Sequence, residues 1–122
     1  MSTICHFDLP ASDVENLKQF YRRLFGWAFA PGDGPDAWRI QFPKPDVTAE
    51  ITGAIVMRSA PEQPIGCYFS VSSVEDSSDL IREMGGKVFV PRAAVTGKGY
   101  YACCLDPEKN YFIIWEADSD AD

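Results

Sequence analysis

The stretch TICHFDL at residues 3–9, followed by SDVENLKQFYRRLF at 12–25 and by Gly26, sets a pattern that the chain repeats. The second copy is GCYFSV at residues 66–71, followed by VEDSSDLIREM at 74–84 and by two glycines. Each copy predicts a strand, an amphipathic helix and a glycine stop. A repeat of about sixty residues in a chain of 122 indicates two similar half-modules within one domain.

Each half continues with alternating or apolar runs that predict three more strands. We expect these strands at residues 27–30, 37–42, 51–57, 88–90, 100–105 and 111–115. The order βαβββ therefore occurs twice. The predicted parts are a first module at about 1–58, a linker at about 59–65, a second module at about 66–116, and an acidic tail at 117–122 that we expect to be frayed.

The predicted fold class is α+β, with eight strands in one cupped mixed sheet and both helices on its outer face. Each helix covers one face of its half-sheet and leaves the other face bare. Two curved half-sheets placed edge to edge enclose a cleft. The repeat therefore indicates where a ligand would bind.

Composition and charge limit the classes of function. The net charge of −7 argues against a nucleic-acid partner, because neutralising phosphates requires a basic surface. An acidic protein attracts cationic ligands, or is simply kept in solution by its charge. No apolar run approaches the roughly 20 residues that span a bilayer, and no basic segment followed by an apolar stretch marks a secretory signal. We therefore expect a cytoplasmic protein with no membrane partner.

The four cysteines lack metal-ligand spacing. Cys5, Cys67 and the adjacent Cys103 and Cys104 include no CxxC pair. Neighbouring strand residues point to opposite faces, so Cys103 and Cys104 cannot both face one metal ion. The pattern is typical of reduced, mostly buried thiols in a reducing compartment.

Five short motifs give the chain a resemblance to a known superfamily. They are His6-Phe7-Asp8-Leu9-Pro10, FYRRLFGW at residues 20–27, Tyr68-Phe69-Ser70-Val71, Met84-Gly85-Gly86-Lys87-Val88, and LDPEKN at residues 105–110. The chain resembles the vicinal oxygen chelate superfamily, which contains glyoxalases, bleomycin-resistance proteins and extradiol dioxygenases. The likeness extends over nearly the whole chain and is greatest to a bacterial group of small glyoxalase-related proteins. It implies paired βαβββ modules in a cupped sheet.

The resemblance also implies, in many members, a metal ion held inside the cup by two histidines and two carboxylates. These ligands come from the first and last strands of each half. In this chain His6 matches the first position, but the second half has Gly66 there, and the last-strand carboxylate position falls on Ile113. The strand at 51–57 contains no acid, and Glu50 lies only at its start. Because such an ion needs three or four protein ligands, we expect no metal and no other cofactor.

His6 is the single histidine of the chain, and three interpretations of it stay open. It is a remnant of a ligand set, a general base, or a hydrogen-bonding wall residue. Asp8 lies on the same strand face, where it would orient the imidazole or meet a cationic ligand. No serine or cysteine has a visible partner beyond His6, so the sequence does not support acyl transfer.

Aromatic and apolar residues provide the candidate wall of the cleft. The predicted ligand-binding residues are His6, Asp8, Trp38, Tyr68, Ser70, Tyr101, Tyr111, Ile113 and Trp115. Aromatic walls with a few polar groups are typical of a small-molecule pocket. The alternative is that these rings fill the cleft or bury themselves in a dimer.

The leading hypothesis is metal-free binding of a small organic molecule, cationic or aromatic, in an aromatic cup. The first alternative is an enzyme, either a metal-dependent lyase or dioxygenase or an acid–base enzyme that uses His6. The second is a non-catalytic partner module with a filled cup. We also expect a homodimer, which the resemblance implies and exposed strand edges make reasonable.

Overall fold

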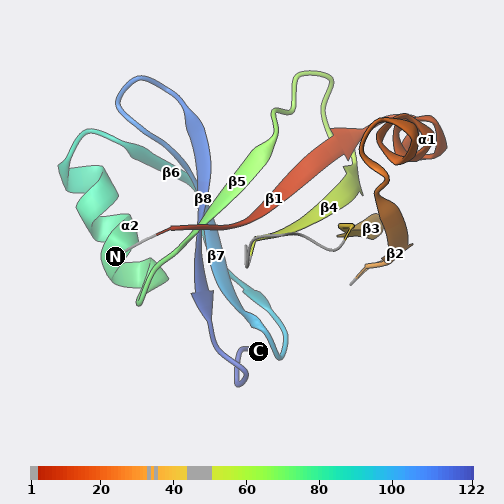
Figure 1. The fold of residues 1–122 in the computed structure, drawn as a ribbon. Helices are drawn as coiled ribbons and strands as arrows, with labels where there is room; N and C mark the ends of the chain where they lie inside the picture. The colour runs from red at the N-terminus through yellow and green to blue at the C-terminus, as the bar shows by residue number, and fades with distance from the viewer. Residues whose placement is uncertain (1–2, 33, 35, 44–50) are drawn as a thin grey trace. The chain divides into compact units, whose positions relative to one another are not determined.

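A computed structural model describes residues 3–32, 34, 36–43 and 51–122. Within them, eight strands and two helices follow one another in the order β-α-β-β-β, twice (Figure 1). The elements are β1 Ile4–Ala11, α1 Val14–Phe25, β2 Ala28–Pro31, β3 Ala37–Gln41, β4 Thr52–Met57, β5 Gly66–Ser70, α2 Val74–Glu83, β6 Lys87–Val95, β7 Gly99–Leu105 and β8 Tyr111–Ala117. The predicted α+β class, with mixed strands and two βαβββ modules, is confirmed.

The chain forms two compact units. The first is His6–Ile65, and the second is Gly66–Asp122 together with the N-terminal residues up to Cys5. Backbone pairing ties these N-terminal residues to the second unit, because Ser70 N–H donates to Thr3 O over 3.1 Å. The repeat in the sequence does not indicate this division, since β1 begins in the second unit.

Residues at both ends of α1 satisfy its unpaired backbone groups. The Asp13 carboxylate accepts a hydrogen bond from Asn16 N–H over 3.1 Å, and Glu15 adds negative charge to the first turn. Gly26 ends the helix with a φ of 73°, which glycine adopts without steric cost.

The sheet of the first unit has the strand order β2-β3-β4-β1, with β1 and β4 parallel. Helix α1 covers one face of this sheet. The buried residues between them are Leu9, Ala11, Val14, Ile40 and Ile55. Because strand residues alternate, Phe7 and Leu9 face the helix, whereas His6 and Asp8 face the other side.

Gly53 makes room for Phe7 of the neighbouring strand. The two residues are opposite one another in the parallel register of β1 and β4. A Cβ at position 53 would lie 2.6 Å from Phe7 Cζ and 3.0 Å from Ile40 Cδ1, which is inside the repulsive range for carbon atoms. The missing side chain lets the phenyl ring lie directly on β4, in the core under α1.

The sheet of the second unit has the strand order β5-β8-β7-β6, with β5 and β8 parallel. Two side chains cap α2: the Ser73 hydroxyl accepts from Asp76 N–H over 3.1 Å, and the Glu116 carboxylate of β8 accepts from Val74 N–H over 2.9 Å. The buried residues between α2 and the sheet are Val74, Ala102, Cys104 and Ile114. Strand β8 therefore fixes the start of α2 as well as the centre of the sheet.

The Asp106 carboxylate holds the turn between β7 and β8. It accepts hydrogen bonds from the backbone N–H groups of Glu108 and Asn110, over 2.8 and 2.9 Å, and from the Asn110 side-chain amide over 2.9 Å. These bonds, with the Asn110 side chain first, hold the pKa of Asp106 below its ordinary value. The turn accounts for the aspartate and asparagine of the LDPEKN motif.

The helices bury less apolar surface than their sequence patterns predict. The spacing places four residues on the sheet side that are in fact 51–63% exposed: Leu24, Phe25, Leu80 and Met84. The buried helical residues are Val14, Val74 and Ser78. On each helix, the buried side chains therefore begin in the first turn. They cover a narrower face of the helix than the spacing of its apolar residues predicts. No helix in the described residues is long and apolar enough to cross a membrane.

The acidic end of the chain is anchored, and the prediction that it is frayed is wrong. Gly97 N–H donates to Ala121 O over 2.7 Å, and Asp118 N–H donates to Lys98 O over 2.8 Å. Ala121 is only 4% exposed. The prediction rested on the charge of the tail, and backbone pairing with the β6–β7 turn overrides that charge.

Stability should fall at alkaline pH because of Cys104. Burial, and then the neighbouring Cys103, raise the pKa of this thiol from 9.0 to about 11. Above pH 9.0 the unfolded chain loses the thiol proton while the folded chain keeps it, so the free energy of unfolding should fall by about 1–2 kcal/mol as the pH approaches 11.

Urea unfolding across this pH range, compared between the wild type and Cys104→Ala, measures the effect. The variant loses packing at every pH but should lack the extra alkaline fall. An identical pH dependence in both proteins would contradict the assignment to Cys104.

Candidate functional site

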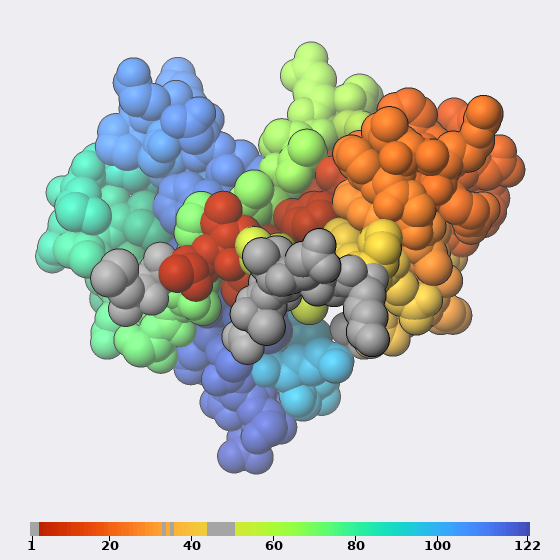
Figure 2. Space-filling model, viewed as in Figure 1, coloured from red at the N-terminus to blue at the C-terminus, as the bar shows by residue number. Residues whose placement is uncertain are grey.

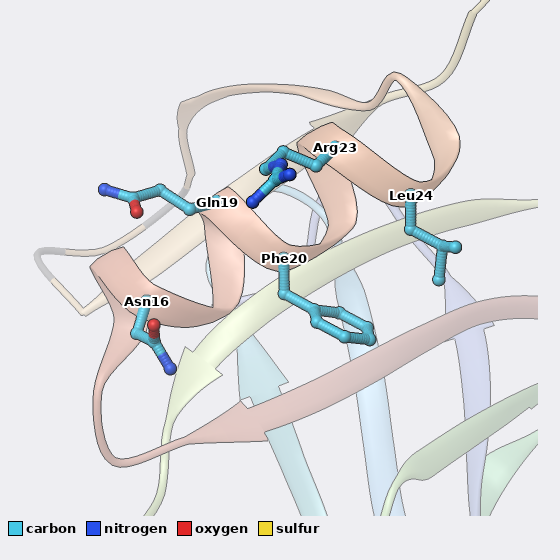
Figure 3. Close-up of a pocket in the computed structure, with 5 residues that line it drawn as sticks. All are labelled: Asn16, Gln19, Phe20, Arg23 and Leu24. Carbon is cyan, nitrogen blue, oxygen red and sulfur yellow. The ribbon is translucent and has the colours of Figure 1, made fainter.

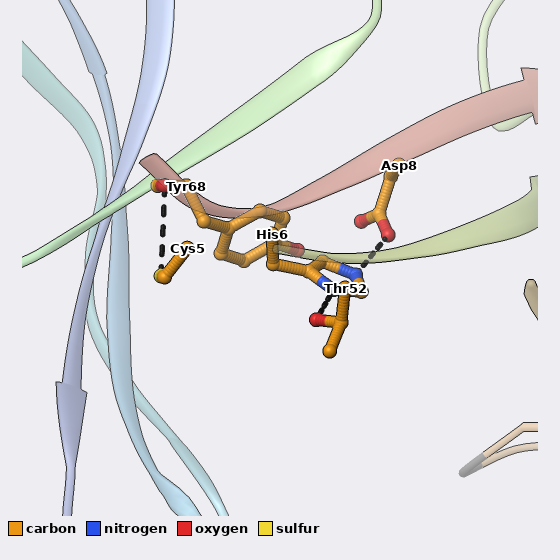
Figure 4. A network of polar contacts seen from close by, with 5 residues as sticks. All are labelled: Cys5, His6, Asp8, Thr52 and Tyr68. Atoms are coloured by element: carbon orange, nitrogen blue, oxygen red, sulfur yellow. Dashed lines mark hydrogen bonds and ion pairs between the residues drawn. The ribbon is translucent and has the colours of Figure 1, made fainter. Parts of the chain in front are cut away.

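The imidazole of His6 is held between a hydroxyl and a carboxylate (Figure 4). His6 lies opposite Thr52 in the parallel pairing of β1 and β4, and its Nδ1 is 2.5 Å from Thr52 Oγ1. Its Nε2 is 2.9 Å from Asp8 Oδ1, two residues further along β1. The side chains of His6 and Asp8 are 29% and 19% exposed, so the cluster is only partly shielded from solvent.

The carboxylate determines which imidazole nitrogen carries the proton. An ionised Asp8 can only accept, so the Nε2 of a neutral His6 donates to it. The lone pair of Nδ1 then faces Thr52, whose hydroxyl donates to it. The hydrogen bonds therefore run in one direction, from Thr52 through His6 to Asp8. The expected place of Asp8 beside the imidazole is observed.

Thr52 is a site residue that the sequence patterns do not indicate. It starts β4 and contacts His6 only because β1 and β4 pair in parallel in this register. That register joins residues 46 positions apart, and no local pattern reports it. The only signal in the sequence is a polar residue at one end of the apolar run TGAIVM.

The same face of the first unit also carries a guanidinium. Asp8 is paired with Ala54, and Ala54 is paired with Arg39, so the three form a row across β1, β4 and β3. Arg39 is exposed, and only the methyl group of Ala54 stands between it and the carboxylate in this row. This face thus offers a hydroxyl, an imidazole, a carboxylate and a cation on three adjacent strands.

Trp38 lies on the opposite, helix-covered face of this sheet, so its predicted place in the wall of the cleft is corrected. It is paired with Ile55, which is fully buried under α1. The Lys18 ammonium group of α1 lies over the indole, 5.1 Å from the ring centroid. The alternation of Trp38 with Ile40 marks the helix side of β3, and Ile40 is only 5% exposed.

Six predicted residues share the sheet face of the second unit that α2 does not cover. We call it the aromatic face, and its residues are Tyr68, Ser70, Tyr101, Tyr111, Ile113 and Trp115. In the pairing of β5 with β8, Tyr68 lies opposite Ile113 and Ser70 lies opposite Trp115. Tyr101 of β7 lies opposite Trp115 from the other side. The alternate residues of β8 pack under α2, which fixes this orientation.

The rings of the aromatic face are held by close neighbours. A Cβ at Gly99 would lie 2.7 Å from Trp115 Cζ2 and 2.2 Å from Glu116 O, so position 99 requires glycine and the indole lies directly on β7. The ring of Tyr111 lies 5.7 Å from that of Phe89, and its hydroxyl donates to Cys103 Sγ over 3.5 Å. These contacts restrict the orientation of Trp115 and Tyr111.

None of the four cysteines, all of which lie in the described residues, forms a disulfide, and three have raised pKa values. Burial raises the pKa of Cys5, Cys103 and Cys104, with a hydrogen bond from Tyr111 partly opposing it at Cys103. A raised pKa keeps a thiol protonated and unreactive at neutral pH. These three thiols therefore do not resemble nucleophiles or metal ligands.

The family whose model the sequence matches agrees with this fold. The family model of the Glyoxalase/Bleomycin resistance protein/Dioxygenase superfamily matches residues 3–114. The chain belongs to this superfamily. Among curated proteins, none matches the sequence significantly.

Solved structures of the superfamily fold are similar over nearly the whole chain at low identity. A hypothetical protein from Bacillus halodurans C-125 has a TM-score of 0.68 at 13% identity, covering 99% of this chain and 98% of that one. Methylmalonyl-CoA epimerase from Mycobacterium tuberculosis has 0.63 at 10%, covering 94% and 87%. Homoprotocatechuate 2,3-dioxygenase from Brevibacterium fuscum, solved with 3,4-dihydroxyphenylacetate, has 0.67 at 14%, covering 98% and 37%. At these identities the likeness shows the fold alone.

The side chains here do not fit the four-ligand metal site that superfamily resemblance implies. Thr52, and no carboxylate, lies opposite His6, and both imidazole nitrogens are hydrogen-bonded. Gly66 has no side chain, and Ile113 is 3% exposed and apolar. In the described part of the chain, no three His, Cys, Asp or Glu residues form a group that could hold a metal ion. Glu50 lies outside the described residues.

A concavity of about 490 Å³ opens on helix α1, and none of the predicted site residues is in its described lining (Figure 3). Its described lining consists of Asn16, Gln19, Phe20, Arg23 and Leu24. The segment that contains α1 is coloured orange in the space-filling view of Figure 2. The described lining has no carboxylate and no acid–base pair, so we interpret it as a surface groove without catalytic chemistry of its own.

The single histidine allows a direct test of the hydrogen-bond chain. Nitrogen-15 NMR of the neutral imidazole should show Nε2 protonated and Nδ1 unprotonated, because Asp8 accepts from Nε2. Asp8→Asn should mix the two tautomers, since an amide both donates and accepts. Thr52→Val should move the Nδ1 resonance without changing the tautomer. A dominant Nδ1–H tautomer in the wild type would contradict the chain.

Proposed function

We propose that this superfamily member binds a small organic molecule on the aromatic face of its second unit, without a metal ion. The observation that carries the proposal is the shared orientation of Tyr68, Tyr101, Tyr111 and Trp115 on one side of three paired strands. Ser70 adds a hydroxyl beside Trp115. Flat rings with a few hydroxyl groups suit an organic guest held by stacking and oriented by directional hydrogen bonds.

A cationic or aromatic guest fits the electrostatics best. The faces of tyrosine and tryptophan rings attract ammonium and guanidinium groups, and aromatic guests stack on them. The net charge of −7 favours the approach of cations. Solved relatives of the fold include complexes with small organic ligands, among them 3,4-dihydroxyphenylacetate.

Trp115→Leu should weaken this binding. Removal of one stacking ring costs about 1–2 kcal/mol, or roughly 5–30-fold in Kd. A panel of quaternary ammonium and neutral aromatic compounds is first tested for a rise in melting temperature, and hits are titrated calorimetrically. The matched control is Trp38→Leu, which removes an indole from the helix-covered face and should leave Kd unchanged.

Two outcomes would contradict the proposal. One is the absence of any thermal shift in the wild type, which would favour a non-catalytic partner module. The other is a stoichiometric divalent metal in untagged protein by elemental analysis, which would favour a metal-dependent lyase or dioxygenase.

A second candidate function is acid–base catalysis by His6. The observation that favours it is the hydrogen bond from His6 Nε2 to Asp8, which orients the imidazole and fixes its tautomer. In this function His6 Nδ1, which faces the Thr52 hydroxyl, acts as the proton acceptor.

We propose that the chain forms a homodimer through α1. Phe20 and Leu24 project on one side of this helix and are 55% and 57% exposed. The helix carries Glu15 in its first turn and Arg22 and Arg23 in its last. Antiparallel apposition of two copies places each acidic end beside a basic end, which is a self-complementary arrangement for a two-fold interface.

Phe20→Glu should convert the dimer into a monomer, because it brings a charge into the apolar centre of that interface. Sedimentation velocity measures the change. Met84→Glu, which alters a similarly exposed apolar residue after α2, serves as the control and should remain dimeric. A monomeric wild type, or equal dissociation of both variants, would contradict the proposal.

A further inference from the structure

We propose that Thr52 is an acyl-accepting nucleophile activated by His6 and Asp8, and that these residues, on the face of the first unit that α1 does not cover, hydrolyse small carboxylic esters. The proposal does not depend on ligand binding by the aromatic face. It rests on the line of three functional groups, in which Asp8 Oδ1 is 2.9 Å from His6 Nε2, and His6 Nδ1 is 2.5 Å from Thr52 Oγ1.

The three groups have the roles that such chemistry needs. A hydroxyl nucleophile requires a base within hydrogen-bond reach, and the base requires a third group that orients it. Here the carboxylate holds Nε2 and the hydroxyl meets Nδ1, so the two imidazole nitrogens exchange the roles that they have in serine proteases. Since triads are defined by geometry and roles, this exchange leaves the proton path intact.

The nucleophile is accessible, and the base is partly shielded. Thr52 is exposed, whereas the side chains of His6 and Asp8 are 29% and 19% exposed. The row of Asp8, Ala54 and Arg39 runs beside Thr52, with the methyl group of Ala54 between the two charges. A small ester can therefore approach the hydroxyl over Ala54.

The reaction balances with water as the only co-reactant. Thr52 Oγ1 bonds to the ester carbonyl carbon while its proton passes to His6 Nδ1. The carbon–oxygen bond to the leaving alcohol then breaks, and that alcohol takes the proton from His6. Water attacks the resulting threonine ester with His6 again as base, which releases the carboxylic acid and restores the Thr52 hydroxyl. Asp8 touches no reacting atom and acts as a positioning residue.

Acetylation by 4-nitrophenyl acetate tests the proposal on the full chain. Release of 4-nitrophenolate gives the rate, and peptide mass spectrometry gives the acetylated residue. We expect one acetyl group on Thr52 in the wild type, none at this position in Thr52→Ala, and retained acetylation in Thr52→Ser. His6→Gln should slow acetylation of Thr52 about 100-fold, the lower limit for loss of a general base.

Controls separate this chemistry from a structural role. Thr96→Ala removes an exposed threonine from the β6–β7 turn and should leave the rate unchanged. Asp8→Asn should lower the rate about tenfold and change the imidazole tautomer in the same sample, which separates positioning from loss of fold. Urea unfolding verifies that the variants fold. Equal release of 4-nitrophenolate by the wild type and by folded Thr52→Ala, or by the wild type and His6→Gln, would overturn the proposal.

Discussion

Each sheet has one face under a helix, and strand alternation then decides which side chains remain available for chemistry. In the first unit the helix side takes Phe7 and Leu9, and the other side keeps His6 and Asp8. In the second unit the helix side takes Ile114, and the other side keeps Ile113 and the aromatic residues beside it. A shift of one residue in either register would exchange these sets and bury the polar groups.

The two units present different surfaces as a result. The first combines a hydroxyl, an imidazole, a carboxylate and an exposed guanidinium, and the second combines one indole and three phenol rings with the Ser70 hydroxyl. The two units therefore share the same order of secondary structure but present different functional groups. Gly66, seven residues before the cap Ser73, corresponds to His6, seven residues before the cap Asp13, so the second copy lacks an imidazole.

Local patterns in the sequence were enough to predict the element order and most of the faces. The alternation in β1 placed Asp8 beside His6, and the repeat placed six aromatic-face residues in strands that do pair. Trp38 was misplaced because its face depends on the pairing of β3 with β4, which buries its partner Ile55. Thr52 was missed for a similar reason, since a parallel register across 46 residues leaves no local trace. The anchored tail was also unpredictable, because backbone hydrogen bonds do not depend on side-chain identity.

The pairing of Phe7 with Gly53 has a consequence for how this sequence can evolve. The ring fills the volume that a side chain at position 53 would take, with Ile40 closing the space from β3. A larger side chain at position 53 therefore requires a smaller one at position 7. Either substitution alone leaves a clash or a void. Homologous sequences should show these two sites varying in opposite directions of size, while position 6, on the other side of the same strand, drifts independently of both.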